Sequence, residues 1–380
     1  MNKVVCRQVS IESPAASRDC VFSFEVPVPD APPRGALIRV VCAGACYRMR
    51  SRTRSASSTE EGGAAGGGLE GGCSEAHHGV RDGALFPGYE VAGVVDKLGS
   101  EVMEEVSAVA DHQFAVGKRV VIYPYDGIPH GYAEYIVVPS LSYLVSVPDN
   151  LPLGVAAMLP TGALLAKNAV ITAHQHVVEL LESRAADKMV RILIVGTGGL
   201  ALWAIRIAEH HFKTPEHRDR VKITVAALKN EGLVLAAAAL KSVNIVQWNE
   251  DVYEKQLIER TKDACSGLVD IVIDFGTTSR SLHRSLQCLN SGGVVLVSEE
   301  VAERLLPKFS RLIAETNKKI EAVAPGSIEQ LQQLVEYVAA GDIIPPPHTE
   351  FSADEAPRVV QKLCQSEIPG RAILRFHDIQ

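Results

Sequence analysis

The alternation of apolar and polar positions divides the chain into two kinds of region. Before about residue 150, short apolar runs are separated by Gly, Pro and polar residues, which is typical of β-strands joined by turns. From about residue 190 onward, apolar runs alternate with segments in which apolar residues recur with helical spacing. This order predicts an all-β part, followed by repeated β-α-β units whose strands form a parallel sheet covered on both faces.

The expected elements follow from this pattern. In the first part, strands are expected at 21–26 and 36–42 and within 85–95, 116–122, 131–138 and 144–148, and a helical region begins at 151–167. In the second part, strands are expected at 192–195, 221–227, 244–247, 269–275 and 294–298, separated by helices such as 231–240, 252–261 and 279–289. Toward the end, helices are expected at 328–340 and 353–364 and a closing strand at 371–376.

One strand of the second part runs directly into a glycine-rich turn. The apolar run 192–195 is followed by Gly196, Thr197, Gly198 and Gly199, and helical spacing begins at Leu200. In this Gly-x-Gly-x-x-Ala pattern, the first glycine permits a tight turn and the second lets backbone approach a pyrophosphate. Phosphate oxygens are then stabilised at the helix N-terminus. The pattern favours nucleotide binding, and a glycine-rich turn without a ligand is the alternative.

Composition changes abruptly between residues 51 and 84, which are rich in Ser, Gly, Glu and Ala. Such a segment buries too little apolar area to offset the entropy lost on ordering, so a flexible surface loop is expected. Cys73, His77 and His78 lie within it and offer metal-ligand chemistry. Without a helix or strand to frame them, a solvated surface is the favoured interpretation.

Length and charge narrow the function classes. A chain of 380 residues is long enough for two domains, and an apolar share of 47% with 22% charged residues is ordinary for a globular protein. The net charge is −7 and there is no basic block, which argues against nucleic acid or an anionic membrane as a partner. No long apolar segment follows Met1, so a cytoplasmic location is expected. The eight cysteines form no C-x2-C pair, which disfavours a four-cysteine zinc lobe.

Nine short pieces of the sequence resemble the medium-chain dehydrogenase/reductase superfamily and follow one another in the order found in that family. The superfamily contains zinc alcohol dehydrogenases, quinone oxidoreductases and enoyl reductases. The pieces are 43–46 (AGAC), 87–95 (PGYEVAGVV), 116–120 (VGKRV), 131–135 (GYAEY), 156–160 (AAMLP), 196–199 (GTGG), 269–274 (VDIVID), 292–295 (GGVV) and 370–374 (GRAIL). The resemblance implies a Rossmann domain, here 173–325, inserted into a GroES-like β-barrel domain, here 1–172 plus 326–380. It also implies an active site in the cleft between them and a homodimer.

The resemblance breaks at the residues that would hold a catalytic zinc. The positions that carry the family's ligands correspond here to Cys46, Tyr89 and Thr161, of which only the cysteine is a good ligand. Because catalytic zinc needs three protein ligands and an open position, the metal is expected to be absent. A site rebuilt from Cys46, Glu90 and His130 is the alternative.

The residues after Cys46 also depart from the family pattern. Members with alcohol chemistry usually have a hydroxyl residue there that relays a proton, whereas this chain continues with Tyr47, Arg48 and Met49. The usual proton relay is therefore missing.

Cofactor preference is expected to depend on the end of the second Rossmann strand. A carboxylate there would bind the ribose 2′-hydroxyl of NAD, but the position holds Ala227, and Lys229 follows. The missing carboxylate and the nearby cation favour NADP over NAD. In the alternative, Lys229 is a solvated loop charge. Arg371 matches a family arginine that approaches the cofactor pyrophosphate, although an arginine that opens an edge strand is also often structural.

Two functions remain open from the sequence. The first is a zinc-independent, NADPH-dependent oxidoreductase that transfers hydride to a quinone, an enone or another carbonyl substrate. Tyr89 or Tyr47 would donate a hydrogen bond to the developing charge, unless both only line the cleft, and Cys46 is either part of the site or a buried apolar filler. The second is a catalytically inactive member that acts as a nucleotide-binding regulatory or interaction protein.

Overall fold

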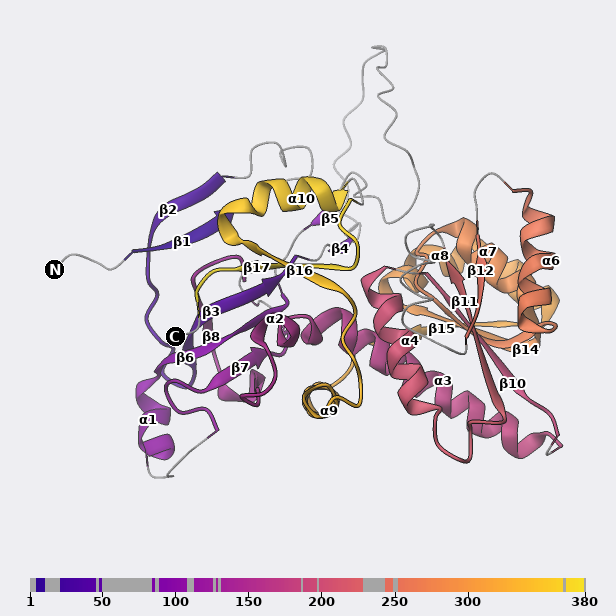
Figure 1. Cartoon of the computed structure of the whole chain (residues 1–380), viewed down its shortest axis with the longest axis horizontal. Coiled ribbons are helices and arrows are strands. Elements are labelled where there is room, and N and C mark those ends of the chain that lie inside the picture. The colour runs from indigo at the N-terminus through magenta and orange to yellow at the C-terminus, as the bar shows by residue number, and fades with distance from the viewer. Residues whose placement is uncertain are drawn as a thin grey trace, which may run out of the picture.

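Two large β-sheets organise the molecule (Figure 1). The computed structural model describes residues 5–10, 21–45, 48–49, 84–85, 89–107, 113–125, 128, 131–185, 187–196, 198–227, 243–248, 252–364 and 367–378. Most of the segment 51–84 and the whole expected helix at 231–240 lie outside these residues. Within the described residues, no helix combines the length and the hydropathy that crossing a membrane requires.

The six-stranded sheet has the strand order β12-β11-β10-β13-β14-β15, and every neighbouring pair in it is parallel. Its strands are β10 (Val190–Val195), β11 (Val221–Ala227), β12 (Asn244–Gln247), β13 (Val269–Asp274), β14 (Leu289–Ser298) and β15 (Lys319–Val323). Counted along the chain, this is the order 3-2-1-4-5-6 of the doubly wound dinucleotide fold. The expected α/β class with a Rossmann sheet is confirmed. The strand order reverses between β10 and β13, where such sheets bind their ligands.

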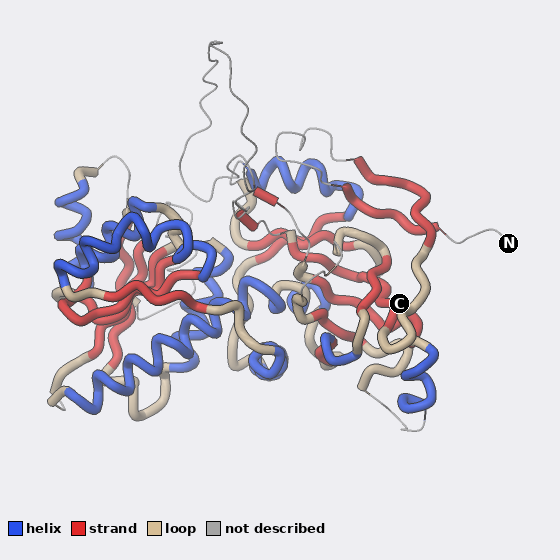
Figure 2. Tube along the Cα trace, turned by 180° about the vertical axis from the view of Figure 1, so that it is seen from behind, coloured by secondary structure: helices blue, strands red, loops and turns tan. Residues whose placement is uncertain are grey.

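Alternate residues of the central strands β10 and β13 enter two different cores, which explains why these two strands are mostly apolar. Ile192, Ile194 and Ile271 pack on one face together with Trp203, whereas Leu193, Val195 and Val272 pack on the other together with Leu282 and Leu286. Helices lie on both sides of the strands (Figure 2). These helices are α3 (Leu164–Ser183), α4 (Gly199–His211), α6 (Glu254–Cys265), α7 (Ser279–Cys288) and α8 (Glu299–Thr316).

The seven-stranded sheet combines strands from both ends of the chain. Its order is β16-β17-β3-β6-β7-β9, and β8 also pairs with β3. The strands are β3 (Ala36–Gly44), β6 (Val91–Leu98), β7 (Arg119–Ile122), β8 (Tyr135–Val138), β9 (Leu144–Ser146), β16 (His348–Ser352) and β17 (Arg371–Arg375). Because β17 pairs with β3 with Leu374 opposite Ala43, the chain returns to its first sheet after completing the other.

The remaining elements are short or connect the two sheets. They are β1 (Val5–Ser10), β2 (Val21–Pro27), β4 (Arg48–Met49), β5 (Ala84–Leu85), α1 (Ser100–Ser107), η2 (Leu141–Tyr143), α2 (Leu153–Ala156), η3 (Leu159–Ala163), α9 (Ile328–Ala340), η4 (Ala353–Glu355) and α10 (Ala356–Cys364). The run from α2 through η3 into α3 leads the chain from the seven-stranded sheet to the six-stranded one (Figure 1).

Three histidine rings pack together between α3, the end of α4 and the turn that follows it. The centroid of the His174 ring lies 4.6 Å from that of His211 and 5.0 Å from that of His217. Burial, reinforced by the neighbouring histidines His174, His217 and His210 and by Lys167, lowers the pKa of His211 to about 4. The His211 ring therefore packs best as a neutral imidazole.

Acid is expected to destabilise the fold through this cluster. In the folded chain His211 binds a proton less readily than in the unfolded chain, where a histidine has a pKa of about 6.5. The contribution of the neutral His211 ring to the stability of the fold is therefore complete above pH 6.5 and is lost as the pH falls toward 4. Because His211 is partly exposed, we expect a loss of about 1–2 kcal/mol, measured by urea denaturation at several pH values. His211→Gln should remove this part of the pH dependence, and an unchanged slope would contradict the assignment.

Candidate nucleotide-binding site

The glycine-rich turn joins β10 to α4 in the geometry of a phosphate-binding turn. Gly196 has φ of +118°, which only glycine adopts readily, and a Cβ on it would lie 3.3 Å from the Cβ of Ala201. Gly198 is the extended N-cap residue, and the 13-residue helix α4 begins at Gly199. The free N–H groups at a helix start favour an anion. Thr197 lies outside the described residues.

The side chain of Arg371 lies across this helix N-terminus. A Cβ on Gly199 would be only 2.4 Å from Cδ of Arg371 and 3.0 Å from its Nη1, so the arginine fills the space that a larger residue would need. Arg371 is the first residue of β17 and is 8% exposed. The phosphate turn of one sheet and a strand of the other therefore meet at this guanidinium. A cation beside helix N–H groups suits a phosphate ligand.

Glu90 fixes the guanidinium from the opposite side. Its carboxylate is fully buried just before β6 and accepts hydrogen bonds from Arg371 Nη2, from the Thr161 hydroxyl and, at 3.1 Å, from the Gly162 amide. Gly44 leaves room for it, since a Cβ there would lie 2.2 Å from Glu90 Oε2. Charge-assisted hydrogen bonds of this kind offset the cost of burying both charges.

Thr161 and Gly162 belong to η3, a π-helical turn that continues directly into α3. Such turns are rare and frequently occur at functional sites. Here the turn directs one hydroxyl and one amide of adjacent residues at the same oxygen, Glu90 Oε1. The turn therefore connects the buried ion pair to a helix that covers the Rossmann sheet.

The positions that the resemblance assigns to zinc are only partly described. Tyr89 is half-buried and packs against the apolar core of the seven-stranded sheet, and the Thr161 hydroxyl is engaged by Glu90. Cys46, Tyr47 and His130 lie outside the described residues. In the described part of the chain, no three His, Cys, Asp or Glu side chains are grouped so that they could hold a metal ion.

The end of β13 forms a second wall beside the glycine turn. The amide of Phe275 donates to the carbonyl of Val195 at 3.0 Å, and a Cβ on Gly196 would lie 3.5 Å from that of Phe275. Asp274 is buried, and burial raises its pKa to about 6 although Gly276 N and Ser285 Oγ donate to it at 2.7 and 2.9 Å. Its hydrogen bonds hold the start of the loop that follows β13.

At the end of β11, where a carboxylate would bind a ribose, the structure places the fully buried Ala227. Its carbonyl accepts from the Trp248 amide at 2.8 Å. The last residue of β11 therefore carries no carboxylate, and residues 228–242 that follow it lie outside the described part of the chain. Lys229, the cation expected beside it, lies outside the described residues.

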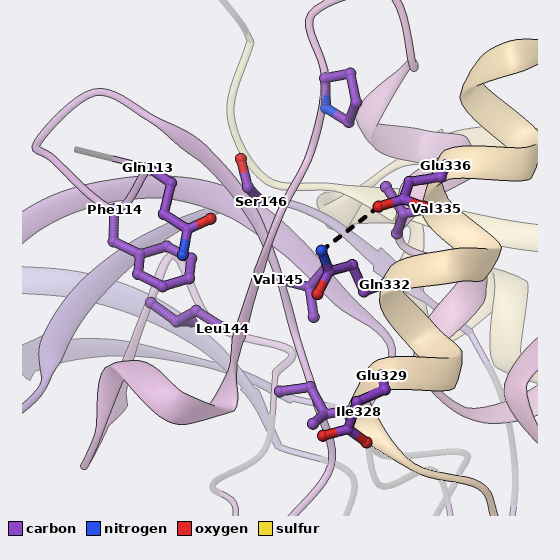
Figure 3. Close-up of a pocket in the computed structure, with 11 residues that line it drawn as sticks. Gln113, Phe114, Leu144, Val145, Ser146, Ile328, Glu329, Gln332, Val335 and Glu336 are labelled. Carbon is purple, nitrogen blue, oxygen red and sulfur yellow. Dashed lines mark hydrogen bonds between the residues drawn. The ribbon is translucent and has the colours of Figure 1, made fainter. Parts of the chain in front are cut away.

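A cavity of about 300 Å³ lies elsewhere, between β9 and α9 (Figure 3). Phe114 and Leu144 line one side, and Gln332, whose amide donates to Glu336 at 3.4 Å, lines the other. Its charged lining residues, Glu329 and Glu336, are both acidic, and no residue of the glycine turn reaches it. Carboxylates repel phosphates, so this cavity does not suit a nucleotide.

Comparison with known proteins agrees with this geometry. Residues 250–374 match the family model of the zinc-binding dehydrogenases. The chain is 22% identical over 314 residues to a zinc-type alcohol dehydrogenase-like protein of Schizosaccharomyces pombe, covering 77% of this chain and 82% of that protein. It is 24% identical over 298 residues to an NADP-dependent alcohol dehydrogenase of Mycolicibacterium smegmatis, covering 71% and 76% of the two chains.

A solved structure shows the same fold over almost the whole length. The quinone oxidoreductase from Coxiella burnetii superposes with a TM-score of 0.65 at 18% identity, covering 98% of this chain and all of that one. The strand order of the parallel sheet, the glycine turn and the family match at 250–374 lead to one assignment. The whole chain has the fold of the medium-chain dehydrogenase/reductase superfamily of oxidoreductases, and residues 250–374 match its zinc-binding dehydrogenase family.

Proposed function

We propose that the protein is a zinc-independent, NADPH-dependent oxidoreductase that transfers hydride to a quinone, an enone or another carbonyl compound. The observation that carries this proposal is the guanidinium of Arg371, which lies against Gly199 at the start of α4 and is held there by Glu90. It supplies a positive charge beside the helix N–H groups, where the pyrophosphate of a dinucleotide would bind.

The residues fit a nicotinamide cofactor. Gly196 and Gly199 keep side chains out of the turn, and the loop after β13 lies on its other side. The bound nicotinamide would supply the hydride. The buried Ala227 places no carboxylate against a 2′-phosphate, and Lys229 is two residues further along the chain. The NADP-dependent relative from Mycolicibacterium smegmatis makes the same preference reasonable here.

The same residues do not fit a catalytic zinc. Thr161 takes the place of a family ligand, but its neutral hydroxyl donates to Glu90. Glu90 is also engaged by Arg371 and the Gly162 amide, so a site rebuilt around its carboxylate would have to break the buried ion pair. A substrate that delocalises negative charge, such as a quinone or an enone, requires the chain only to bind and orient it. Tyr89 and Tyr47 are the proposed hydrogen-bond donors to that substrate.

The proposal is tested by titrating the purified protein with NADPH and NADH and then adding a panel of quinones and enones. We expect NADPH to bind at least about tenfold more tightly than NADH, because the 2′-phosphate meets a cation and no carboxylate. Oxidation of NADPH, followed by its absorbance, should require the added acceptor. Elemental analysis should find less than stoichiometric zinc.

Other outcomes have distinct meanings. Binding of NADPH without turnover of any acceptor would favour the inactive, nucleotide-binding regulatory or interaction protein. Stoichiometric zinc that is lost together with activity on chelation would contradict zinc independence. Absence of NADPH binding would contradict both functions.

A further inference from the structure

Thr277 has an unusual backbone conformation. Three non-glycine residues of the described chain have positive φ: Ser266 at 60°, Thr277 at 55° and Asn317 at 49°. Ser266 and Asn317 are the left-handed C-caps of α6 and α8, where this conformation commonly ends a helix. Thr277 ends no helix, and its branched Cβ makes the left-handed region especially unfavourable. The surrounding structure must therefore impose the conformation.

The residues on both sides of Thr277 are held firmly. The Gly276 amide donates to Asp274 Oδ1 at 2.7 Å, and a Cβ on Gly276 would lie 2.5 Å from Ser281 Cβ. Thr278 caps α7 by accepting a hydrogen bond from the Ser281 amide at 3.0 Å. The backbone is therefore held in place on both sides of Thr277.

Arg304 holds Thr277 itself. This half-buried residue of α8 donates from Nη2 to the carbonyl of Thr277. It forms no ion pair with the described residues, and its Nε is buried without a hydrogen-bond partner among them. Burying part of a guanidinium with incomplete hydrogen bonding is unfavourable. The hydrogen bond to Thr277 therefore satisfies the half-buried guanidinium only in part.

The loop that carries Thr277 lies at the functional edge of the sheet. It follows β13 at the point where the strand order reverses, and Phe275 at its start packs beside Gly196 of the phosphate turn. Ligands of doubly wound sheets bind in the crevice outside these strand ends. A strained residue there indicates a constraint of function more than one of packing.

We propose that Arg304 is a positioning residue for nucleotide binding. By holding Thr277 in the left-handed conformation, it keeps the loop 275–278 preformed as a wall of the dinucleotide site. This inference rests on the proposed function. It implies that relieving the strain stabilises the protein and weakens nucleotide binding, because a relaxed loop occupies the binding conformation only part of the time.

The test compares the thermal midpoint and the NADPH dissociation constant of four single variants and one double variant with those of the unaltered chain. Thr277→Gly should raise the midpoint by about 1–2 °C and raise the dissociation constant about fivefold. Arg304→Met should raise the dissociation constant about tenfold, and Arg304→Lys should restore part of the affinity. Ser266→Gly is the matched control, since it relieves a left-handed residue that precedes β13, at the opposite end of this strand from the loop, and should leave the affinity unchanged.

The double variant Thr277→Gly with Arg304→Met should bind no more weakly than Arg304→Met alone, because both changes release the same loop. A Thr277→Gly variant that keeps its NADPH affinity within twofold would overturn the inference while leaving the proposed function intact. Failure of the unaltered chain to bind NADPH would overturn both.

Discussion

Replacing Glu90 by Ala should destabilise the protein by about 3–5 kcal/mol, one of the two largest effects that we expect of a single substitution. The variant leaves the guanidinium of Arg371, whose side chain is 9% exposed, without its buried carboxylate. It also removes the acceptor for the Thr161 hydroxyl and the Gly162 amide. The loss would be measured as a shift in urea denaturation followed by circular dichroism.

Two further variants separate the buried charge from other causes. Glu90→Gln combined with Arg371→Met removes both charges and should recover most of the lost stability. Asp270→Ala breaks the ion pair of Arg184 and Asp270 beside the other, six-stranded sheet and should also destabilise the fold. Only the changes at Glu90 and Arg371 should weaken NADPH binding as well. A loss below about 1 kcal/mol for Glu90→Ala would show that the pair contributes little.

The sequence was most informative where an element is determined by its own residues. Strands β11 and β12 begin and end at the expected residues, and β10 and β13 differ from expectation by two residues or fewer at each end. The central strands β10 and β13 are buried on both faces, so they form mostly apolar runs that stand out in the sequence. The strand order then follows from the connection rules of β-α-β units.

Helix α8 and strand β15 were not predicted from the sequence, and each omission has a physical reason. Helix α8 contains Pro307 in its interior, which normally marks a helix end. It continues past the exposed proline because Leu305 before it and Phe309 and Leu312 after it pack against the same core. Strand β15 follows as an edge strand whose residues Lys319 and Glu321 give it no apolar run. In both cases packing against the rest of the sheet outweighs the local signal.

The candidate nucleotide-binding site likewise combines one feature that the sequence predicts with one that it does not. The glycine turn is local, and its spacing alone indicated the strand, the turn and the helix that the structure contains. The pairing of Glu90 with Arg371 joins residues 281 positions apart, and neither has a local pattern that names the other. A charged residue within an otherwise apolar stretch, as in Gly-Tyr-Glu-Val-Ala-Gly, indicates a buried carboxylate but does not identify its cation.

Gly199→Ala should weaken NADPH binding by about 2 kcal/mol, or roughly 30-fold in the dissociation constant. The new Cβ would lie 2.4 Å from Cδ of Arg371, so the arginine must leave the start of α4 and with it the place where the pyrophosphate binds. Fluorescence titration with NADPH measures the loss.

A second glycine at the same junction provides the control for this change. A Cβ on Gly162 would meet its nearest neighbour, Glu90 Oε1, at an ordinary 3.4 Å, so Gly162→Ala should alter the affinity less than about threefold. If the arginine is the reason for the loss, Arg371→Met should weaken binding to a similar degree, and combining it with Gly199→Ala should add little. Equal effects of the two alanine substitutions would show that the position of Arg371 does not control binding, because only one of them displaces its side chain.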